Sequence, residues 1–221
     1  MTKQQMNIKG KRILLVGATG VLGRVYASEL AKVDNVQLMI ADTSQTDVLT
    51  YAKKLGVEGV EIDLTSEASV VECLKYVKSK FGGLDSVINN AAATGEGLMN
   101  AGEVFADFED YPLDVWQKTL DINLTGVFLV AREAGRLIKA TSKFGIMINI
   151  SSIYGVVGPD HRIYEGQSFK SFPAYSASKA GVIGLTKWLA TWWGGNIRVN
   201  CVIPGGVFNK HNKDFVEAYS N

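Results

Sequence analysis

The chain has few cysteines, no long apolar run and no excess of charge of either sign. Its two cysteines, Cys73 and Cys201, have no close cysteine or histidine partner, which argues against a disulfide framework or zinc site and predicts two buried free thiols and no bound metal. No run approaches the roughly 20 apolar residues that span a bilayer. The polar segment Met1–Lys11 lacks the apolar centre of a secretion signal, so we expect a cytoplasmic protein with no membrane partner.

The balance of charge excludes a further class of partner. The 23 basic and 22 acidic side chains leave a formal net charge of +1, and no cluster of Lys and Arg stands out. A nucleic-acid-binding face concentrates positive charge. We therefore expect a small-molecule substrate and no nucleic acid.

Six short runs rich in β-branched apolar residues alternate with stretches of helical spacing. The runs are Arg12–Val16, Val36–Ala41, Gly59–Ile62, Asp85–Asn89, Gly145–Ile150 and Ile197–Ile203. Near-continuous apolarity is typical of strands covered on both faces. The alternation predicts a single α/β domain over residues 1–221, a doubly wound parallel sheet of the Rossmann type whose ligands bind at the carboxyl ends of the strands.

Two helical stripes and one long loop complete this prediction. One stripe contains Val70, Leu74, Val77 and Phe81, with Ser66 as its N-cap and Gly82-Gly83 as its end. The other contains Trp116, Leu120, Val127, Ala131, Ala134 and Ile138. The stretch 156–173 fits neither helix nor strand, and long ordered loops in compact domains tend to be functional.

The first run leads directly into a glycine-rich turn that precedes a helical pattern. Glycines allow a tight turn and a close approach of backbone to a pyrophosphate, whose charge the helix N-terminus meets. A plain strand–helix turn is the alternative, which the position after the first strand makes less favoured. The candidate cofactor-binding residues of the turn are Gly17, Thr19, Gly20, Val21, Leu22 and Gly23.

Polar side chains follow the next three runs as well. Asp42 is placed to accept hydrogen bonds from the adenosine ribose and to repel a 2′-phosphate, which favours NAD(H) over NADP(H); a solvated loop aspartate is the alternative. Asp63-Leu64 could contact the adenine, or Asp63 could cap a helix. Asn89 and Asn90, with the small residues Ala91 and Ala92, suit backbone packed against a ribose, although a turn also uses asparagine.

The fifth run ends at Ser151-Ser152, and Tyr175-Ser-Ala-Ser-Lys179 comes later in the chain. Tyr175 and Lys179 share a helix face, because they are four residues apart. A tyrosine that acts as a base near pH 7 needs a pKa roughly 3 below its ordinary value of about 10. A neighbouring ammonium and a positively charged nicotinamide together can supply that depression.

These pieces together make the chain resemble the short-chain dehydrogenase/reductase family along nearly its whole length. The matching segments, in the family's order, are Gly17-Ala-Thr-Gly-Val-Leu-Gly23, Asp63-Leu64, Asn89-Asn-Ala-Ala92, Asn123 in Asp-Ile-Asn-Leu-Thr-Gly, Ile150-Ser-Ser152, Tyr175-Ser-Ala-Ser-Lys179, Arg198-Val-Asn200 and Pro204-Gly205.

The resemblance implies a role for each matching residue. Tyr175 would exchange the proton, and Lys179 would lower the pKa of Tyr175 and hold the nicotinamide ribose. Ser152, rather than Ser151, would hydrogen-bond the reacting oxygen, and Asn123 would hold a water in a proton relay behind Lys179. The nicotinamide side would be lined by Pro204, Gly205 and Val207.

The sequence departs from the family pattern in three places. The glycine spacing matches the longer, nucleotide-sugar-modifying branch, with Val21 where the shorter branch has glycine. The stretch between Ser152 and Tyr175 is unusually long, which places His161, Arg162, Tyr164 and Glu165 over the substrate pocket, suited to a hydroxylated or anionic substrate unless the loop is merely solvated. Such insertions resemble members tied to bacterial surface-sugar and flagellin modification. Only His211–Asn221 follow the last motif, so we expect six strands and no seventh.

Trp188, Trp192 and Trp193 follow Lys179 on the same predicted helix, where core packing is expected. In similar proteins this helix and the one carrying Asn123 contact a second subunit, which predicts a homodimer or homotetramer.

Three functions compete. The favoured one is an NAD(H)-dependent oxidoreductase that moves a hydride between nicotinamide and an alcohol or ketone carbon of a polar, sugar-derived substrate. A nucleotide-sugar epimerase or dehydratase shares the glycine turn and the Tyr/Lys pair. A non-catalytic NAD-binding protein is the third, disfavoured because Asn123, Ser152, Tyr175 and Lys179 are all present.

Overall fold

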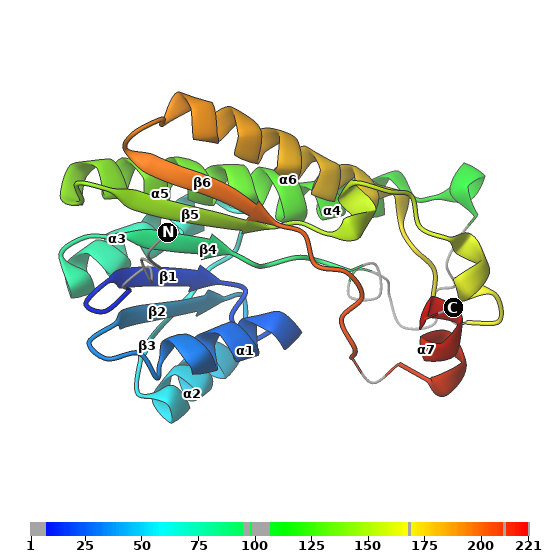
Figure 1. Ribbon diagram of the computed structural model, residues 1–221, viewed down its shortest axis with the longest axis horizontal. Coiled ribbons are helices and arrows are strands. Elements are labelled where there is room, and N and C mark those ends of the chain that lie inside the picture. The colour runs from blue at the N-terminus through cyan, green and yellow to red at the C-terminus, as the bar shows by residue number, and fades with distance from the viewer. Residues whose placement is uncertain (1–7, 95–97, 99–106, 168, 210, 221) are drawn as a thin grey trace, which may run out of the picture.

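In the described part of the chain, six parallel strands form one sheet in the order β3-β2-β1-β4-β5-β6 (Figure 1). The computed structural model describes residues 8–94, 98, 107–167, 169–209 and 211–220. The strands are β1 (Arg12–Val16), β2 (Gln37–Asp42), β3 (Glu58–Glu61), β4 (Ser86–Asn89), β5 (Gly145–Ile150) and β6 (Ile197–Val202). The strand order reverses between β1 and β4, which is where doubly wound sheets bind their ligands.

Helices cover the sheet from both sides. The helices α1 (Val21–Leu30) and α2 (Gln45–Leu55) pack on Ile13 and Leu15 of β1, whereas Leu14 and Val16 of the same strand face the opposite side. That opposite side is covered by α3 (Glu67–Phe81), α5 (Gly126–Thr141) and α6 (Pro173–Trp192) (Figure 1). Because successive residues of β1 are all buried, the run is apolar without alternation. The predicted doubly wound α/β fold is confirmed.

The predicted elements differ from the observed ones mainly at their ends. The predicted bounds of β1 and β5 match, and the other strands begin or end within one residue of prediction. Ser66 caps α3 by accepting a hydrogen bond from the Ser69 amide, and Gly82 ends α3 with a positive φ of 72°. The second stripe is not one regular helix: α4 (Leu113–Leu120) passes into a π-helical turn (Asp121–Thr125) before α5 begins. Hydrophobic periodicity alone could not show this turn.

The long loop contains more local structure than the sequence predicts. Short 3₁₀ turns η4 (Ile153–Gly155) and η5 (His161–Tyr164) lie within or beside it, and another, η2 (Phe108–Asp110), precedes α4. Helix α7 (Lys213–Ser220), where no helix was expected, follows the last strand and lies beside η5 (Figure 1). Residue 168 of the loop and the terminal residues 1–7 and 221 of the predicted domain lie outside the described residues. No helix in the described ranges is long and apolar enough to cross a membrane.

The expectation of core packing is right for one tryptophan and wrong for two. Trp193 is buried at the end of α6 and packs on Gly135 of α5. Trp188 and Trp192 are 56% and 68% exposed and stack on each other, with ring centroids 5.2 Å apart. Their positions four residues apart place both rings on the solvent side of α6. Both cysteines are free as predicted, Cys73 fully buried and Cys201 only partly.

A buried ion pair joins three elements at the amino ends of the strands. The Arg12 guanidinium donates to both Asp85 carboxylate oxygens, each at 2.9 Å, and also to the Thr141 carbonyl. The Ser142 hydroxyl donates to Asp85 at 2.6 Å. Although burial by itself would raise the pKa of Asp85, the hydrogen bonds from Arg12 and Ser142 hold it well below its usual value. The pair therefore links β1, the start of β4 and the end of α5.

Replacing Arg12 with methionine should lower the free energy of unfolding by about 3 kcal/mol, because Asp85 is left charged and largely buried without its partner. Arg136→Met is the control, since Arg136 is 74% exposed in its ion pair with Glu133 and should change stability by less than about 0.5 kcal/mol. Urea unfolding at neutral pH measures both. Equal effects of the two variants would show that the buried pair contributes no more than a surface pair.

Candidate active site

The glycine-rich turn after β1 is packed against the turn after β4. Gly17 has a φ of +81°, and a Cβ there would overlap the backbone of Ala91. The side-chain amide of Asn90 donates from Nδ2 to the Gly17 carbonyl at 2.8 Å. A Cβ on Gly23 would overlap the Gly17 carbonyl oxygen. Glycine is thus required at 17 for both conformation and space, and at 23 for close packing of α1 on the turn.

The N-terminus of α1 is left without a side-chain cap. Gly20 occupies the N-cap position and can supply no side-chain acceptor, so the first amides of the helix are free to bind an anion. Val21, in that first turn, is 45% exposed, and Leu22 is half-buried. With the close approach of Gly17 to Ala91, these features fit the pyrophosphate of a dinucleotide.

Asp42 is tied to the glycine-rich turn by its own carboxylate. One of its oxygens accepts hydrogen bonds from the amide and the hydroxyl of Thr19, at 2.8 and 2.7 Å. The other accepts from the Thr43 amide at 2.9 Å. Since a carboxylate has about four lone-pair sites, one acceptor position remains, on the oxygen that faces Thr43. Asp42 is therefore a structural part of the turn and keeps one position for a ribose hydroxyl.

Asp63 is bound within its own turn. One of its oxygens accepts from the Thr65 amide and hydroxyl, at 2.9 and 2.7 Å, which forms a local turn, whereas the cap of α3 is Ser66 and not Asp63. The side chain of Leu64 is buried and packs beside Gly126. The predicted contacts of Asp63, Leu64 and Ala92 with the adenosine stay predictions.

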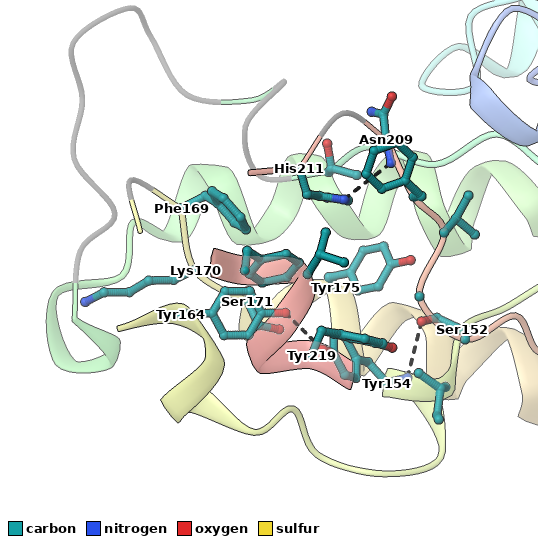
Figure 2. Close-up of a pocket in the computed structure, with 18 of the residues that line it drawn as sticks. Ser152, Tyr154, Tyr164, Phe169, Lys170, Ser171, Tyr175, Asn209, His211 and Tyr219 are labelled. Atoms are coloured by element: carbon teal, nitrogen blue, oxygen red, sulfur yellow. Dashed lines mark hydrogen bonds between the residues drawn. The ribbon is translucent and has the colours of Figure 1, made fainter. Parts of the chain in front are cut away.

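Ser152 and Tyr175 line one cavity of about 510 Å³ at the carboxyl end of the sheet (Figure 2). Ser152 leaves the end of β5, and Tyr175 lies in the first turn of α6. The Ser152 oxygen accepts a hydrogen bond from the Tyr154 amide at 3.2 Å. Gly205 and Val207 line the same cavity, and the Pro204 carbonyl beside them accepts from the Ile153 amide at 3.0 Å. The structure thus brings the end of β5, the start of α6 and the exit of β6 together.

Lys179 lies one helical turn beyond Tyr175 and is only 2% exposed. Its ammonium donates to the Ile150 carbonyl at 2.9 Å and lies 5.6 Å from the centre of the Tyr175 ring. Ser151, next to Ser152, donates its hydroxyl to the Lys179 carbonyl at 2.8 Å. Burial lowers the pKa of Lys179 to about 8. The amine is therefore charged at neutral pH although it is close to losing its proton.

The expected depression of the Tyr175 pKa is not produced by these residues on their own. Burial raises the pKa of Tyr175, and a hydrogen bond with Ser152 offsets part of that rise. Lys179 lies against the ring and bonds to the Ile150 carbonyl, so the phenol oxygen gains little from its charge. Further positive charge at the site is therefore needed before Tyr175 can act as a base near pH 7.

Asn123 is fully buried in the π-helical turn between α4 and α5. Its amide side chain accepts from the Ala93 amide at 2.7 Å and donates to the Ala93 carbonyl at 3.1 Å and to the Ser178 hydroxyl at 3.3 Å. Ser178 in turn donates to the Tyr175 carbonyl at 2.8 Å. Asn123 therefore connects the segment after β4 to the helix that carries Tyr175 and Lys179. π-helical turns are often found at functional sites.

The long loop contributes to the cavity through one of its four predicted residues. Tyr164 lines the cavity, whereas His161, Arg162 and Glu165 are exposed and are not among the described residues that line it. The guanidinium of Arg162 is bound by Asp160 at 2.6 Å. The Tyr164 hydroxyl is 2.9 Å from that of Tyr154 in η4. The loop is thus joined to the segment that holds Ser152.

Sequence reasoning missed Tyr154, Ser178 and the carboxyl-terminal helix α7. Tyr154 and Ser178 are adjacent in sequence to recognised positions, but only the packing of η4 on α6 shows what they contact. The apolar spacing of Phe215 and Tyr219 was the available signal for α7, which contributes both rings to the cavity.

Comparisons with known proteins agree on one family. A family model described as short chain dehydrogenase matches residues 11–220. Trans-4-hydroxycyclohexanecarboxylate dehydrogenase of Sinomonas cyclohexanicum is 35% identical over 94% of this chain and 76% of its own. Post-translational flagellin modification protein A of Campylobacter coli is 26% identical over 96% of this chain and 83% of its own.

Solved structures give the same result. A short chain dehydrogenase from Leptospira borgpetersenii with bound NAD⁺ has a TM-score of 0.81 and 30% identity, covering 96% of this chain and 77% of that one. An NAD⁺-bound xylitol dehydrogenase has a TM-score of 0.73 and 30% identity, covering 90% of this chain and 71% of that one.

The buried amine makes a prediction about stability. An unfolded lysine keeps its proton up to about pH 10.5, whereas folded Lys179 loses it near pH 8. Between these values the unfolded state binds more protons at this group, so the titration of Lys179 by itself adds stability as pH rises. Relative to Lys179→Met, which lacks this titration, the gain between pH 7 and pH 10 should be about 2 kcal/mol.

Urea unfolding of both proteins across this pH range measures the difference. Lys187→Met, on the exposed surface of the same helix, is the control and should follow the wild type. A constant difference between wild type and Lys179→Met at every pH would show that the folded amine does not titrate early.

Proposed function

The chain belongs to the short-chain dehydrogenase family, and from this we propose that it is an NAD(H)-dependent oxidoreductase that interconverts a secondary alcohol and its ketone. The observation that carries the proposal is the shared cavity of Ser152 and Tyr175, with the Lys179 amine buried directly behind the phenol. Tyr175 as a proton donor, Ser152 as a hydrogen-bond donor and Lys179 as a cation, together at the carboxyl end of the sheet, suit chemistry on a carbon–oxygen bond.

The residues divide the work of the reaction. In the direction of oxidation, the substrate hydroxyl binds the Ser152 hydroxyl and transfers its proton to Tyr175, while the hydrogen on the same carbon departs as hydride. A bound nicotinamide supplies the two-electron acceptor for that hydride and, when oxidised, a positive charge beside the phenol. Lys179 would bind the nicotinamide ribose, and its charge, from which the phenol oxygen gains little, would add to that of the nicotinamide. In the direction of reduction Tyr175 returns the proton to the oxygen.

The first helix and Asp42 support the choice of cofactor. The uncapped N-terminus of α1 suits a pyrophosphate, and the free acceptor position on Asp42 suits the hydroxyl of a ribose. A 2′-phosphate would instead meet the carboxylate charge. NAD(H) is therefore the cofactor that the residues fit best.

The relatives and structural neighbours are named for different classes of substrate. One relative is named for a cyclic hydroxy acid, one structural neighbour for a polyol and one relative for flagellin modification. The sugar-derived substrate expected from the polar loop residues stays a prediction. The cytoplasmic location also stays a prediction.

We also propose that two copies of the chain associate through α5 and α6. Trp188 and Trp192 present exposed, stacked rings on α6, and Phe128 is 44% exposed on α5. Association of two copies through these helices would bury such rings.

Tyr175→Phe should lower kcat by at least about 100-fold, because it removes the group that exchanges the proton. Binding of NADH, measured by its fluorescence, should be nearly unchanged, since the ring remains. Rates are measured with NAD⁺ and the best substrate among trans-4-hydroxycyclohexanecarboxylate, xylitol and cyclohexanol. Tyr76→Phe, at a half-buried position of α3 that does not line the cavity, serves as the control and should keep its rate. Turnover by Tyr175→Phe at the wild-type rate would refute the assignment of the proton donor. NADH binding by the wild type without turnover of any of the substrates would favour a non-catalytic protein.

Asp42→Asn should reduce the preference for NAD⁺ over NADP⁺ by about tenfold, the equivalent of about 1.4 kcal/mol, because it removes the charge that repels a 2′-phosphate. Thr19→Val is the matched control: it removes one hydrogen bond to the same carboxylate oxygen but keeps its charge. The ratio of kcat/KM for the two cofactors measures the preference. If both variants change the ratio equally, Asp42 acts by shaping the turn and not by its charge.

A further inference from the structure

One wall of the cavity is built from aromatic rings. They come from two parts of the chain that are distant in sequence, the stretch from η4 to the start of α6 and the carboxyl-terminal segment (Figure 2). These rings are Tyr154, Tyr164, Phe169, Phe172, Phe208, Phe215 and Tyr219.

The rings at the centre of this wall pack on one another. The centroid of Phe169 lies 5.1 Å from that of Phe215 and 5.9 Å from that of Tyr164. Tyr164 and Phe215 are 5.6 Å apart. The Phe215 side chain is buried and anchors α7 to the loop. The wall is therefore a continuous aromatic surface that faces the reacting groups.

Several polar groups along the wall already have protein partners. The Tyr154 and Tyr164 hydroxyls form a hydrogen bond of 2.9 Å. The Lys170 ammonium, at the rim, is paired with Asp107 at 2.9 Å, and both groups are exposed. The Nδ1 of His211 accepts from the Asn209 amide at 3.3 Å. Among the described lining residues there is no carboxylate and no guanidinium.

We propose that the substrate of this site carries its alcohol or ketone on a compact, largely apolar ring. The inference rests on the proposed oxidoreductase function and names its substrate class. Ring faces pack well against the edges and faces of Phe169, Tyr164 and Phe215, with Ser152 and Tyr175 free to take the oxygen. An open-chain polyol has no ring face to pack on these side chains, and it would lose water hydrogen bonds wherever its hydroxyls lie against the rings.

The size of the cavity agrees with such a substrate. Its volume of about 510 Å³ falls in the range of small-molecule sites. Since Gly205 and Val207, predicted to lie on the nicotinamide side, line the same cavity, the nicotinamide takes part of this volume and leaves room for a compact substrate.

The test compares kcat/KM of the full chain with NAD⁺ for three alcohols: cyclohexanol, the open-chain 2-hexanol with the same number of carbons, and xylitol. We expect cyclohexanol to exceed 2-hexanol by about tenfold and xylitol by more. Equal or higher kcat/KM for xylitol would overturn this inference and leave the proposed function standing. Turnover of none of the three would overturn both.

Variants of Phe169 test the wall itself. Phe169→Leu keeps an apolar side chain and removes the ring, so KM for cyclohexanol should rise about tenfold while the rate with 2-hexanol changes little. Phe169→Tyr restores a ring and should restore the KM, which separates ring packing from a general loss of folding. Phe144→Leu, at a 64% exposed position before β5, is the control. Equal changes for cyclohexanol and 2-hexanol in Phe169→Leu would contradict the proposal.

Discussion

The site depends on one buried amine. Lys179 is taken out of water on α6, and a single hydrogen bond to the Ile150 carbonyl at the end of β5 replaces part of its hydration. An ammonium in such a place is costly, which is why its pKa falls to about 8. The same burial makes its charge strong at short range, because little water lies nearby to screen it. The protein thus keeps beside the Tyr175 ring an ammonium that is close to losing its proton.

Hydrogen bonds from neighbouring segments fix the position of the helix that carries Lys179. Ser151 bonds to the Lys179 carbonyl, and Asn123 reaches the same helix through Ser178. Because Asn123 also bonds both backbone groups of Ala93, the helix is tied to the segment that follows β4. The π-helical turn that carries Asn123 is a local departure from regular helix, and it directs the amide into this network. Regular helix on either side supplies the packing that stabilises the turn.

The long loop and α7 form part of the cavity that Ser152 and Tyr175 line. The loop is tied to the catalytic segment through the hydrogen bond between Tyr154 and Tyr164, and Tyr154 also supplies the amide that bonds Ser152. Tyr154 and Tyr164 of the wall are therefore joined directly to the segment that carries Ser152.

The sequence by itself determined the α/β fold, the strand runs to within a residue or so, and the positions of Ser152, Tyr175 and Lys179, because these follow from local apolar patterns and from fixed spacings along the chain. It did not determine the character of the cavity. Three of the four polar loop residues expected over the pocket face solvent, whereas the fourth, Tyr164, turns inward with Phe169 to meet Phe215. Nor did it show that the chain's own groups raise the Tyr175 pKa, or that Trp188 and Trp192 lie outside the core. Burial, the direction of a side chain and the charge felt by a phenol depend on what segments distant in sequence bring alongside, and only the tertiary structure decides that.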